Sequence, residues 1–232
     1  MSLSLVLPCY NPQQGWEQNA CSAYRTFCSK INDPVELIVV MDGKSDSVTN
    51  GTTTFLEQNI RTLKIIKYDE NKGKGYALRK GVEAATGEII LYTDIDFPYT
   101  IESMIVIYQG LKNNEFEVGI GVKNDAYYAH VPVLRRAISR FLRVLIKLFL
   151  SMPVTDTQCG LKGFRRNVAP LFLQTKIDRY LFDLEFVHKC FKSKKYIVKS
   201  IPVQLNENVR FRSMDYRILL PEMINFIKLL FD

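Results

Sequence analysis

Short apolar runs alternate with longer helix-like segments through the first half of the chain, and this rhythm constrains the fold more than any other feature of the sequence. It is typical of βαβ units, in which helices connect the parallel strands of one sheet. We therefore expect an α/β fold with a Rossmann-like, mostly parallel sheet flanked by helices. The expected strands cover residues 3–7, 35–41, 63–68, 88–92 and 117–121, and the expected helices cover residues 15–30, 47–59, 74–85 and 100–113.

The second half departs from this rhythm. Pro221 is expected to kink the last helix, because proline lacks the amide hydrogen that a helix interior uses. Since 232 residues are long for one domain and short for two, we expect one large domain, residues 1–213, with a carboxyl-terminal amphipathic helix in residues 214–232. The expected elements are helices over residues 132–151, 168–174, 181–193 and 216–231, and strands over residues 160–165 and 196–203.

The composition indicates a folded protein that attracts anions. Apolar residues make up 47% of the chain and charged residues 24%, which is near the globular average and argues against disorder or a membrane channel. The formal net charge is +7. Nucleotides, phosphorylated lipids, acidic membrane surfaces and nucleic acids are therefore the partner classes to weigh.

The sequence predicts a cytoplasmic setting without a transmembrane helix. The five cysteines show no CxxC spacing and no neighbouring histidine pair, so neither a disulfide framework nor a zinc site is expected. The amino terminus opens on a strand-like segment without the features of a signal peptide. The longest apolar stretch, residues 141–154, is interrupted by Arg143 and Lys147 and is too short to span a bilayer.

Polar turns follow four of the expected strands. In an open parallel sheet, ligands bind outside the carboxyl ends of the strands, so these turns should converge on one crevice. The fourth turn carries Asp94 and Asp96, two carboxylates whose hard oxygens suit Mg²⁺ or Mn²⁺. Such a pair alone occurs in many solvated loops, but its place among the other turns favours a metal and diphosphate site. The turns are residues 8–11, 42–46, 70–75 and 94–96.

The turn over residues 70–75 contains the glycines of NKGKG and precedes a helix. Glycines let backbone amides approach a phosphate, while the helix amino end and the lysines supply positive potential. An ordinary loop entering a helix is the alternative. Asp42 and Asp46 could each accept hydrogen bonds from a base or a ribose. Because Asp46 could instead cap a helix, Asp42 ranks first.

Five segments in this order resemble family 2 glycosyltransferases, and most of all the dolichyl-phosphate or polyprenyl-phosphate glucosyl- and mannosyltransferases. The resemblance extends from residue 3 to about residue 212. It implies a GT-A type fold for residues 1–213 and an inverting transfer of a hexose from a nucleotide-sugar donor, of the UDP-glucose or GDP-mannose class, to a polyprenyl or dolichyl phosphate. It also implies a Mg²⁺ or Mn²⁺ cofactor. The segments are residues 6–11, 39–43, 71–77, 94–96 and 156–162.

The resemblance assigns a role to individual residues of this sequence. Pro12 and Met214 depart from it, since the family usually has glutamate and often has lysine at these positions, which bears on nucleotide identity and loop closure. The implied nucleotide-sugar-binding residues are Pro8, Tyr10, Asn11, Asp42, Asn71, Gly73, Lys74 and Asp94. The implied catalytic residues are Asp96, Asp156, Gln158 and Lys123, the implied metal ligands are Asp94 and Asp96, and the implied phosphate-binding residues are Arg210 and Arg212.

The acceptor decides whether a general base is needed. A phosphate monoester is largely ionised at neutral pH, because its second pKa is about 6, and it can attack without a base. A sugar hydroxyl would need one. Asp156 could be that base, or it could orient an arginine or a helix end, and both interpretations stay open.

The expected helix over residues 132–151 is basic on one face and apolar on the other. Such a helix can lie on an anionic membrane surface, which suggests a peripheral position at the cytoplasmic face of a membrane. A helix packed on the sheet with a solvated basic side is the alternative. The basic face contains Arg136, Arg140, Arg143 and Lys147, and the apolar face contains Leu134, Ile138, Phe141, Leu145 and Leu148.

Three other functions are weighed. Transfer to a saccharide hydroxyl during surface polysaccharide synthesis is the nearest alternative. A sugar-1-phosphate nucleotidyltransferase usually carries a glycine-rich basic loop after its first strand, which residues 8–11 lack. A nucleic-acid-binding module ranks last, because no nucleic-acid motif is present, and we expect no nucleic-acid partner. A homo-oligomer is left open.

Overall fold

The computed structural model describes residues 1–123, 133–150, 152–154, 156–206 and 219–231. A seven-stranded sheet in the order β3-β2-β1-β4-β6-β5-β7 forms its centre. This sheet confirms the expected α/β fold. Each observed strand boundary lies within two residues of the predicted one. The strands are β1 (Leu3–Cys9), β2 (Val35–Asp42), β3 (Leu63–Tyr68), β4 (Ile89–Tyr92), β5 (Val118–Lys123), β6 (Lys162–Arg165) and β7 (Val198–Val203).

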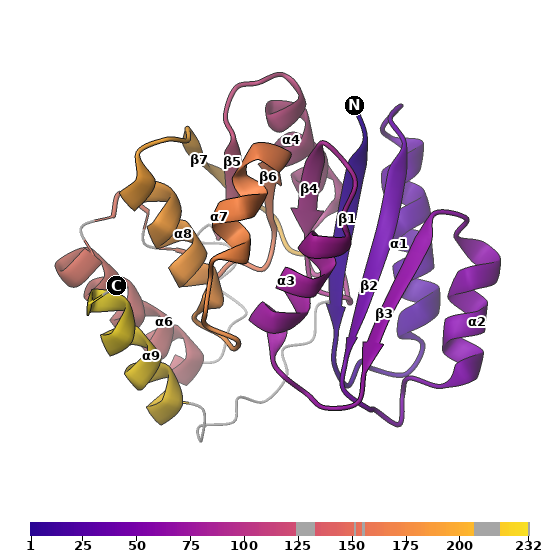
Figure 1. The fold of residues 1–232 in the computed structure, drawn as a ribbon, viewed down its shortest axis with the longest axis horizontal. Coiled ribbons are helices and arrows are strands. Elements are labelled where there is room, and N and C mark those ends of the chain that lie inside the picture. Colours follow the sequence, from indigo (N-terminus) through magenta and orange to yellow (C-terminus); the bar gives the residue numbers. More distant parts are fainter. Residues whose placement is uncertain (124–132, 151, 155, 207–218, 232) are drawn as a thin grey trace.

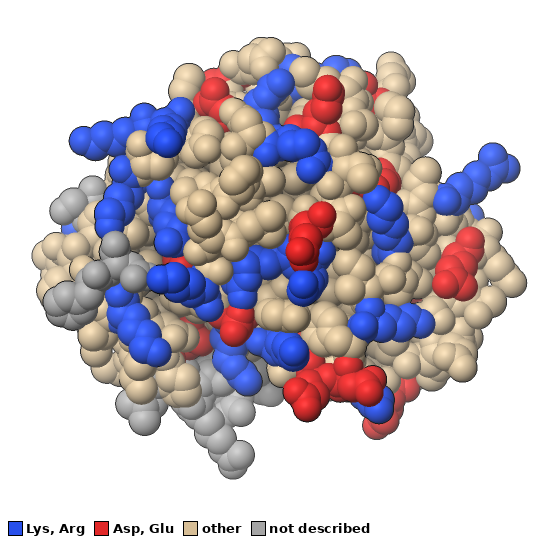
Figure 2. Space-filling view, viewed as in Figure 1, with Lys and Arg blue, Asp and Glu red and all other residues tan. Residues whose placement is uncertain are grey.

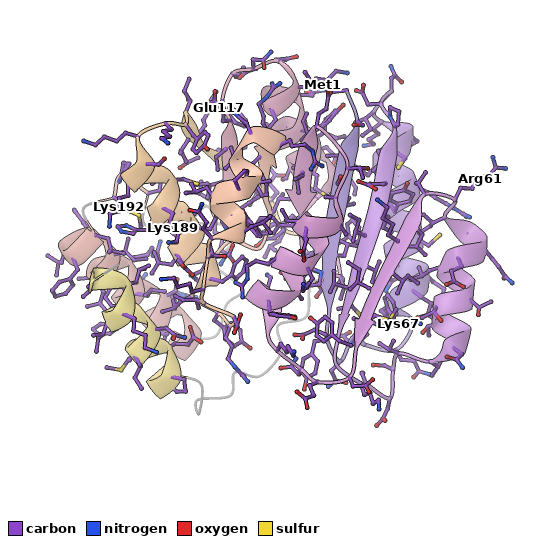
Figure 3. The ribbon with its side chains drawn as sticks, in the orientation of Figure 1. Met1, Arg61, Lys67, Glu117, Lys189 and Lys192 are labelled. Carbon is purple, nitrogen blue, oxygen red and sulfur yellow. The ribbon has the colours of Figure 1, made fainter. Side chains whose placement is uncertain are left out.

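One strand runs against the others. β6 pairs antiparallel with both β4 and β5, whereas the β1–β2, β1–β4, β2–β3 and β5–β7 pairs are parallel. Met1, Arg61 and Glu117 mark the edge where the parallel strands begin, and Lys67 lies near the edge where they end (Figure 3). Because β6 is reversed, its amino end and the loop before it lie at that second edge. The reversal brings residues of the second half of the chain to the carboxyl ends of the first.

Helices cover both faces of the sheet (Figure 1). One layer consists of α1 (Trp16–Ser29), α2 (Asn50–Asn59) and α4 (Ile101–Lys112). The other layer contains α3 (Lys74–Ala84), α7 (Ala169–Leu173) and α8 (Phe182–Ser193), which is joined by α6 (Val133–Leu145) and α9 (Leu219–Phe231).

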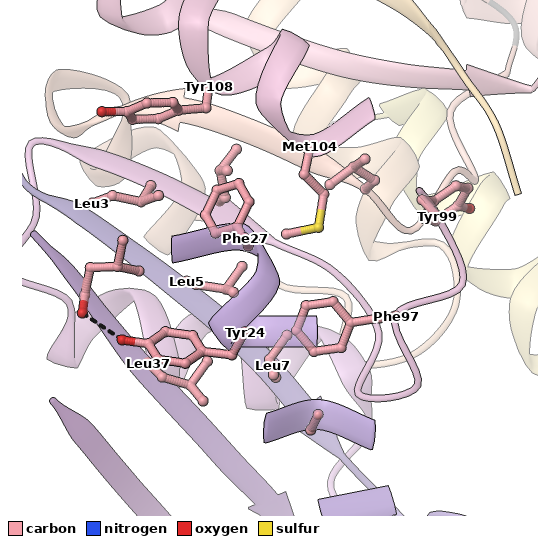
Figure 4. Close-up of a cluster of buried hydrophobic side chains, with 14 of the residues drawn as sticks. Leu3, Leu5, Leu7, Tyr24, Phe27, Leu37, Phe97, Tyr99, Met104 and Tyr108 are labelled. Atoms are coloured by element: carbon pink, nitrogen blue, oxygen red, sulfur yellow. Dashed lines mark hydrogen bonds between the residues drawn. The ribbon is translucent and has the colours of Figure 1, made fainter. Parts of the chain in front are cut away.

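Alternation along β1 supplies both cores. Leu3, Leu5 and Leu7 are at most 1% exposed and pack with α1 and α4 (Figure 4), whereas Val6 faces the opposite layer. This period of two is the pattern of a strand whose faces are both covered. In the first core, the Tyr24 hydroxyl donates to the Val35 carbonyl at 2.9 Å, so the polar end of this buried ring is satisfied.

The second half differs from its prediction in the helix expected over residues 132–151. The helix that was expected to continue to residue 151 changes after Leu145 into a π-helical turn, Ile146–Leu150. Pro221 is the third residue of α9 as the structure describes it, Leu219–Phe231. Because residues 207–218 lie outside the described residues, the expected kink at Pro221 stays a prediction.

The carboxyl-terminal helix α9 packs on the body of the protein. Phe226 and Leu229 are buried in the same core cluster as side chains of α3, α7 and α8. Within the described residues, no helix combines the length and the apolar character needed to cross a membrane.

Candidate active site

A polar hollow lies where the loops after β1 and β2 meet. Its volume is about 340 Å³, and it is lined by Tyr10, Asn11, Lys44, Ser45 and Asp46. The Ser45 hydroxyl donates to Asn11 Oδ1 at 3.2 Å, which links the two loops, and Tyr10 is 52% exposed. An exposed ring beside hydrogen-bonding groups can stack on a nucleobase while those groups bind its edge or its ribose. The structure thus brings together two of the predicted nucleotide residues, Tyr10 and Asn11.

Asp42, another predicted nucleotide residue, points into the protein. It is 2% exposed, and its carboxylate accepts hydrogen bonds from Asn71 Nδ2 at 3.0 Å, from the Lys72 amide at 2.8 Å and from the Gly73 amide at 2.9 Å. Both oxygens of Asp42 are therefore used to hold the loop before α3. In this arrangement Asp42 and Asn71 shape the site from below its surface.

Asp46 has the exposed position that Asp42 lacks. It is exposed and lines the hollow, whereas the expected ranking of the two carboxylates had placed Asp42 first. The alternative that Asp46 caps a helix is also wrong, because α2 begins after Thr49, whose hydroxyl accepts a hydrogen bond from the Thr52 amide at 3.3 Å.

Gly73, before α3, and Gly75, in its first turn, pack closely against the backbone around Asp178. The Gly75 amide donates to the Asp178 carbonyl at 2.7 Å. Gly73 has a φ of 105°, and a Cβ at this position would lie 2.4 Å from the Asp178 oxygen. Only glycine fits so close to another backbone. The expectation that these amides face a phosphate is wrong for this arrangement, because protein oxygens already accept from them.

Lys74 and the predicted metal carboxylates meet at the carboxyl-end edge of the sheet. Lys74 begins α3, and its ammonium lies 2.5 Å from Asp94 Oδ1. Asp94 opens a tight turn after β4, in which the Phe97 amide donates to the Asp94 carbonyl at 3.0 Å. The turn buries Ile95 and leaves Asp96 exposed. Asp94 thus forms an ion pair with Lys74, and Asp96 lies exposed two residues farther along the turn.

Neighbouring charges keep this pair ionised. Burial acts to raise the pKa of Asp94, but the ammonium groups of Lys74, Lys162 and Lys123 together lower that pKa below its ordinary value. For Lys74, burial acts to lower the pKa, and the negative charges led by Asp94 raise it above its ordinary value. Both side chains are therefore charged at neutral pH.

Asp94 and Asp96 fit a divalent cation that also binds a diphosphate. The described residues contain no group of three or more His, Cys, Asp or Glu side chains that could hold a metal. At this edge Asp94 and Asp96 would provide the protein ligands, and phosphate oxygens and water would complete the coordination. Mg²⁺ is commonly bound in this way, by one or two carboxylates and the phosphates of a substrate.

The predicted acceptor residues lie together beside this edge. The Lys123 amide, at the end of β5, donates to Asp156 Oδ2 at 2.6 Å, and Lys123 Nζ donates to the Gln158 carbonyl at 3.3 Å. Gln158 Nε2 is buried and lacks a hydrogen-bond partner among the described residues. Arg210 and Arg212 lie outside the described residues.

Gly160 brings the loop before β6 against Asp94. A Cβ at Gly160 would lie 2.4 Å from Asp94 Oδ2 and 3.4 Å from Lys74 Nζ. The Gly160 amide donates to the Tyr99 hydroxyl at 3.1 Å, which fixes the loop from the other side. A larger residue at this position would displace the Asp94 carboxylate or the loop, which gives a steric reason for the glycine of DTQCG, residues 156–160.

A buried ion pair below the site was missed by the sequence analysis. Lys162 Nζ lies 2.5 Å from Asp183 Oδ1 and also donates to the Cys159 carbonyl at 2.5 Å. The Tyr92 hydroxyl donates to the same Asp183 oxygen at 2.9 Å. The Lys162 and Asp183 side chains are only 0% and 5% exposed. Lys162 starts a strand and Asp183 lies in the first turn of a helix, where charged residues are ordinary, so the sequence offered no signal for their pairing.

Residues 4–171 match the model of glycosyl transferase family 2. The chain belongs to this family. The match confirms the resemblance inferred from the five segments, and it covers the hollow, the Lys74–Asp94 pair and the loop before β6. Membership of the family supports a glycosyltransferase activity, and the side chains at the strand ends described above lie within the matched residues.

Several relatives of this family 2 chain are dolichyl-phosphate beta-glucosyltransferases. The one from Drosophila melanogaster is 27% identical over 237 residues, covering 95% of this chain and 70% of the relative. The one from Dictyostelium discoideum is 24% identical over 199 residues, covering 80% of this chain and 61% of the relative. The chain thus spans between 61% and 70% of the length of these two proteins.

Solved structures confirm that this family 2 member has the GT-A fold. Glucosyl-3-phosphoglycerate synthase from Mycobacterium tuberculosis, crystallised with Mn²⁺, UDP and glucosyl-3-phosphoglycerate, matches with a TM-score of 0.66 at 14% identity, over 99% of this chain and 78% of the other. The same enzyme with Mn²⁺, UDP-glucose and phosphoglyceric acid matches with a TM-score of 0.67 at 15% identity, over the same shares of the two chains. At these identities the likeness concerns the fold alone.

Proposed function

We propose that the chain transfers a hexose from a UDP- or GDP-activated sugar to a polyprenyl phosphate, with inversion at the anomeric carbon and with Mg²⁺ or Mn²⁺ as cofactor. The observation that carries the proposal is the Lys74–Asp94 pair, 2.5 Å apart, next to exposed Asp96 and beside a polar hollow. The names of the relatives support a dolichyl-phosphate acceptor. The Mn²⁺ and UDP-glucose in crystals with the same fold support the donor and the metal.

The donor would lie along the ends of β1, β2 and β4. Tyr10 is exposed at the hollow and can stack on the base, while Asn11 and Asp46 offer acceptor oxygens to the base or ribose. Pro8, within β1, would border the same pocket. Asp42 would act indirectly, by holding the loop that leads to Lys74.

The diphosphate would lie between Lys74 and the two aspartates. A Mg²⁺ or Mn²⁺ ion held by Asp94 and Asp96 would neutralise the diphosphate and so make the nucleotide a better leaving group. The Lys74 ammonium is a second positive charge at the same edge, where it can stabilise the negative charge that develops on the departing phosphate.

The acceptor phosphate would enter from the side of β5 and β6. One of its ionised oxygens attacks the anomeric carbon, and the bond from that carbon to the diphosphate breaks on the opposite face, so the nucleoside diphosphate leaves with the bonding electrons. An ionised phosphate needs no general base. Asp156, which accepts the Lys123 amide at 2.6 Å, would therefore orient Lys123 toward the acceptor phosphate, together with Gln158. Arg210 and Arg212 are proposed as further phosphate contacts.

The membrane surface would be met by α6 and α9. We define the α6–α9 surface by seven exposed apolar residues on these helices and the π-helical turn, interspersed with exposed Arg140, Lys147 and Lys228. A hollow of about 410 Å³ is lined by residues of the π-helical turn, α8 and α9. Basic side chains also gather over α8 and its neighbours (Figure 2). Apolar groups among basic ones suit an anionic membrane. The seven residues are Phe141, Val144, Leu148, Phe149, Met223, Ile224 and Ile227.

The expected apolar face of the helix over residues 132–151 is divided between this surface and the core. Phe141 and Leu148 are 61% and 68% exposed. Leu145, from the same face, packs against the core together with Leu142. The proposed membrane contact therefore combines apolar and basic side chains.

The proposal is tested by lipid-linked product formation. The chain is incubated with radiolabelled UDP-glucose or GDP-mannose, MnCl₂ and polyprenyl phosphate in phospholipid vesicles, and label in the extracted lipid is counted. We expect label with the wild type, loss of label with Asp96→Asn, and wild-type label with Glu83→Gln, which changes an exposed carboxylate paired with Lys80. Full activity of Asp96→Asn would sink the metal assignment. Label on a saccharide acceptor and none on the lipid would select transfer to a hydroxyl.

A further inference from the structure

The Lys74 ammonium forms an ion pair with Asp94, one of the two carboxylates proposed to bind the metal. It lies 2.5 Å from Asp94 Oδ1, and the two side chains are 27% and 36% exposed. A cation that binds Asp94 through Oδ1 would lie beside the Lys74 ammonium, and like charges a few ångströms apart repel each other.

The neighbouring carboxylates give Lys74 little opportunity to move within the protein. Asp183 already accepts from buried Lys162 and from Tyr92. Asp178 forms an ion pair with Arg79. The charge of Asp96 also helps to raise the pKa of Lys74, but Asp96 is the second carboxylate that the cation would bind. An anion brought by the substrate can accept from the Lys74 ammonium without occupying either aspartate, and a diphosphate at this edge has the required charge.

We propose that Lys74 couples metal binding to nucleotide binding: without nucleotide its ammonium holds Asp94, and an arriving diphosphate takes over the ammonium and leaves the carboxylate to the cation. The proposal rests on the proposed function, since it takes a nucleoside diphosphate and a divalent cation as the ligands. By thermodynamic linkage the effect is reciprocal, so each ligand raises the affinity for the other by the same factor, typically about 5- to 150-fold.

The coupling is measured directly by ligand binding. Free Mn²⁺ is followed by electron paramagnetic resonance in titrations of the full chain, without nucleotide and with saturating UDP or GDP, and the signal is corrected for Mn²⁺ bound by the nucleotide itself. We expect wild-type protein to bind Mn²⁺ weakly alone and at least about fivefold more tightly with the preferred nucleotide. Isothermal titration of the nucleotide, with and without Mn²⁺, should return the same factor.

Replacement of Lys74 tests whether its charge couples the two ligands, or whether Mn²⁺ and nucleotide favour each other only because they bind side by side. In Lys74→Met, which keeps the length of the side chain and removes its charge, Mn²⁺ alone should bind more tightly than in the wild type, and the coupling factor should fall toward one. Lys80→Met, which removes an exposed ammonium farther along α3, should keep wild-type coupling. Lys74→Gln provides a second uncharged variant, and the melting temperature of each variant establishes that it is folded.

Two results would overturn the proposal in different ways. If nucleotide binds and the uncharged Lys74 variants keep both the wild-type Mn²⁺ affinity and the wild-type coupling factor, the role of Lys74 is wrong and the proposed function stands. If neither UDP nor GDP binds to the wild type at any Mn²⁺ concentration, the proposed function fails and the coupling fails with it.

Discussion

Two lysine–aspartate pairs, one at the candidate site and one beneath it, differ in burial. The ammonium and carboxylate are 2.5 Å apart in both Lys74–Asp94 and Lys162–Asp183. The first pair is 27% and 36% exposed, and the second only 0% and 5%. A partly exposed pair can exchange partners at modest cost, because water compensates each charge. A buried pair cannot, because an uncompensated charge in the interior is costly. The difference separates a pair suited to exchange ligands from one that holds the fold.

The largest expected effect is loss of the buried pair. Lys162→Met should lower the free energy of unfolding by about 3–5 kcal/mol, because Asp183 would be left as an unpaired buried charge. Urea denaturation followed by circular dichroism measures the change. The double variant Lys162→Met with Asp183→Leu should recover most of the loss, since it removes both charges. A single variant as stable as the wild type would mean that the pair does not stabilise the fold.

The exposed pair should matter more for chemistry than for folding. Asp94→Asn should reduce the rate of hexose transfer on the order of 100- to 1,000-fold, which is the usual effect of removing one group that stabilises transition-state charge. The rate is measured with the lipid assay at saturating donor, alongside Glu83→Gln as the control. A rate within twofold of the wild type would exclude Asp94 from binding the metal or the diphosphate.

Gly160, which lies against Asp94, offers a steric test. Gly160→Ala should destabilise the protein by about 1–3 kcal/mol, because its Cβ would lie 2.4 Å from Asp94 Oδ2 and either the Asp94 carboxylate or the loop before β6 would have to shift. Thermal denaturation gives the stability, and the Mn²⁺ titration with nucleotide gives the effect on the site. We expect both to be impaired, whereas unchanged values would show that this loop is not fixed against Asp94.

The smallest effect is expected for the stability contributed by the exposed pair. Lys74→Met should change the free energy of unfolding by only about 0–1 kcal/mol, because solvent screens the pair. Since the pKa of Asp94 is lowered and that of Lys74 is raised, any stabilisation is present between their ordinary values of 3.8 and 10.5. It is lost as pH falls through the lowered pKa or rises through the raised one. Denaturation across this range tests it, and a difference that grows below pH 3.8 would contradict the sign.

The fold was predictable because its signals are local. The short apolar runs of β1 and β2 and the helical patterns between strands placed most elements within two residues of their observed bounds. The reversed direction of β6 was not predictable, since strand direction depends on pairing between distant segments. The π-helical turn at Ile146–Leu150 was missed for a similar reason, because it depends on packing against the second core.

The sequence predicted which residues lie at the site better than it predicted what each of them does there. Tyr10, Lys74 and Asp94 lie at the expected edge because strand ends converge there. The roles of Asp42 and the loop glycines changed, because their hydrogen bonds join segments about 30 and 100 residues apart. Such pairings are set by the tertiary fold and leave no periodic signal in the sequence.

The most direct test of the central claim is a thermal-shift panel of nucleoside diphosphates and nucleotide sugars, each with and without MnCl₂. Ligands that bind only the folded state raise its melting temperature. If the edge formed by Tyr10, Lys74, Asp94 and Asp96 is a donor site, one base should stabilise the wild type selectively and only with the metal. Asp96→Asn should lose that shift. No shift with any nucleotide, or an equal shift with and without metal, would contradict the account.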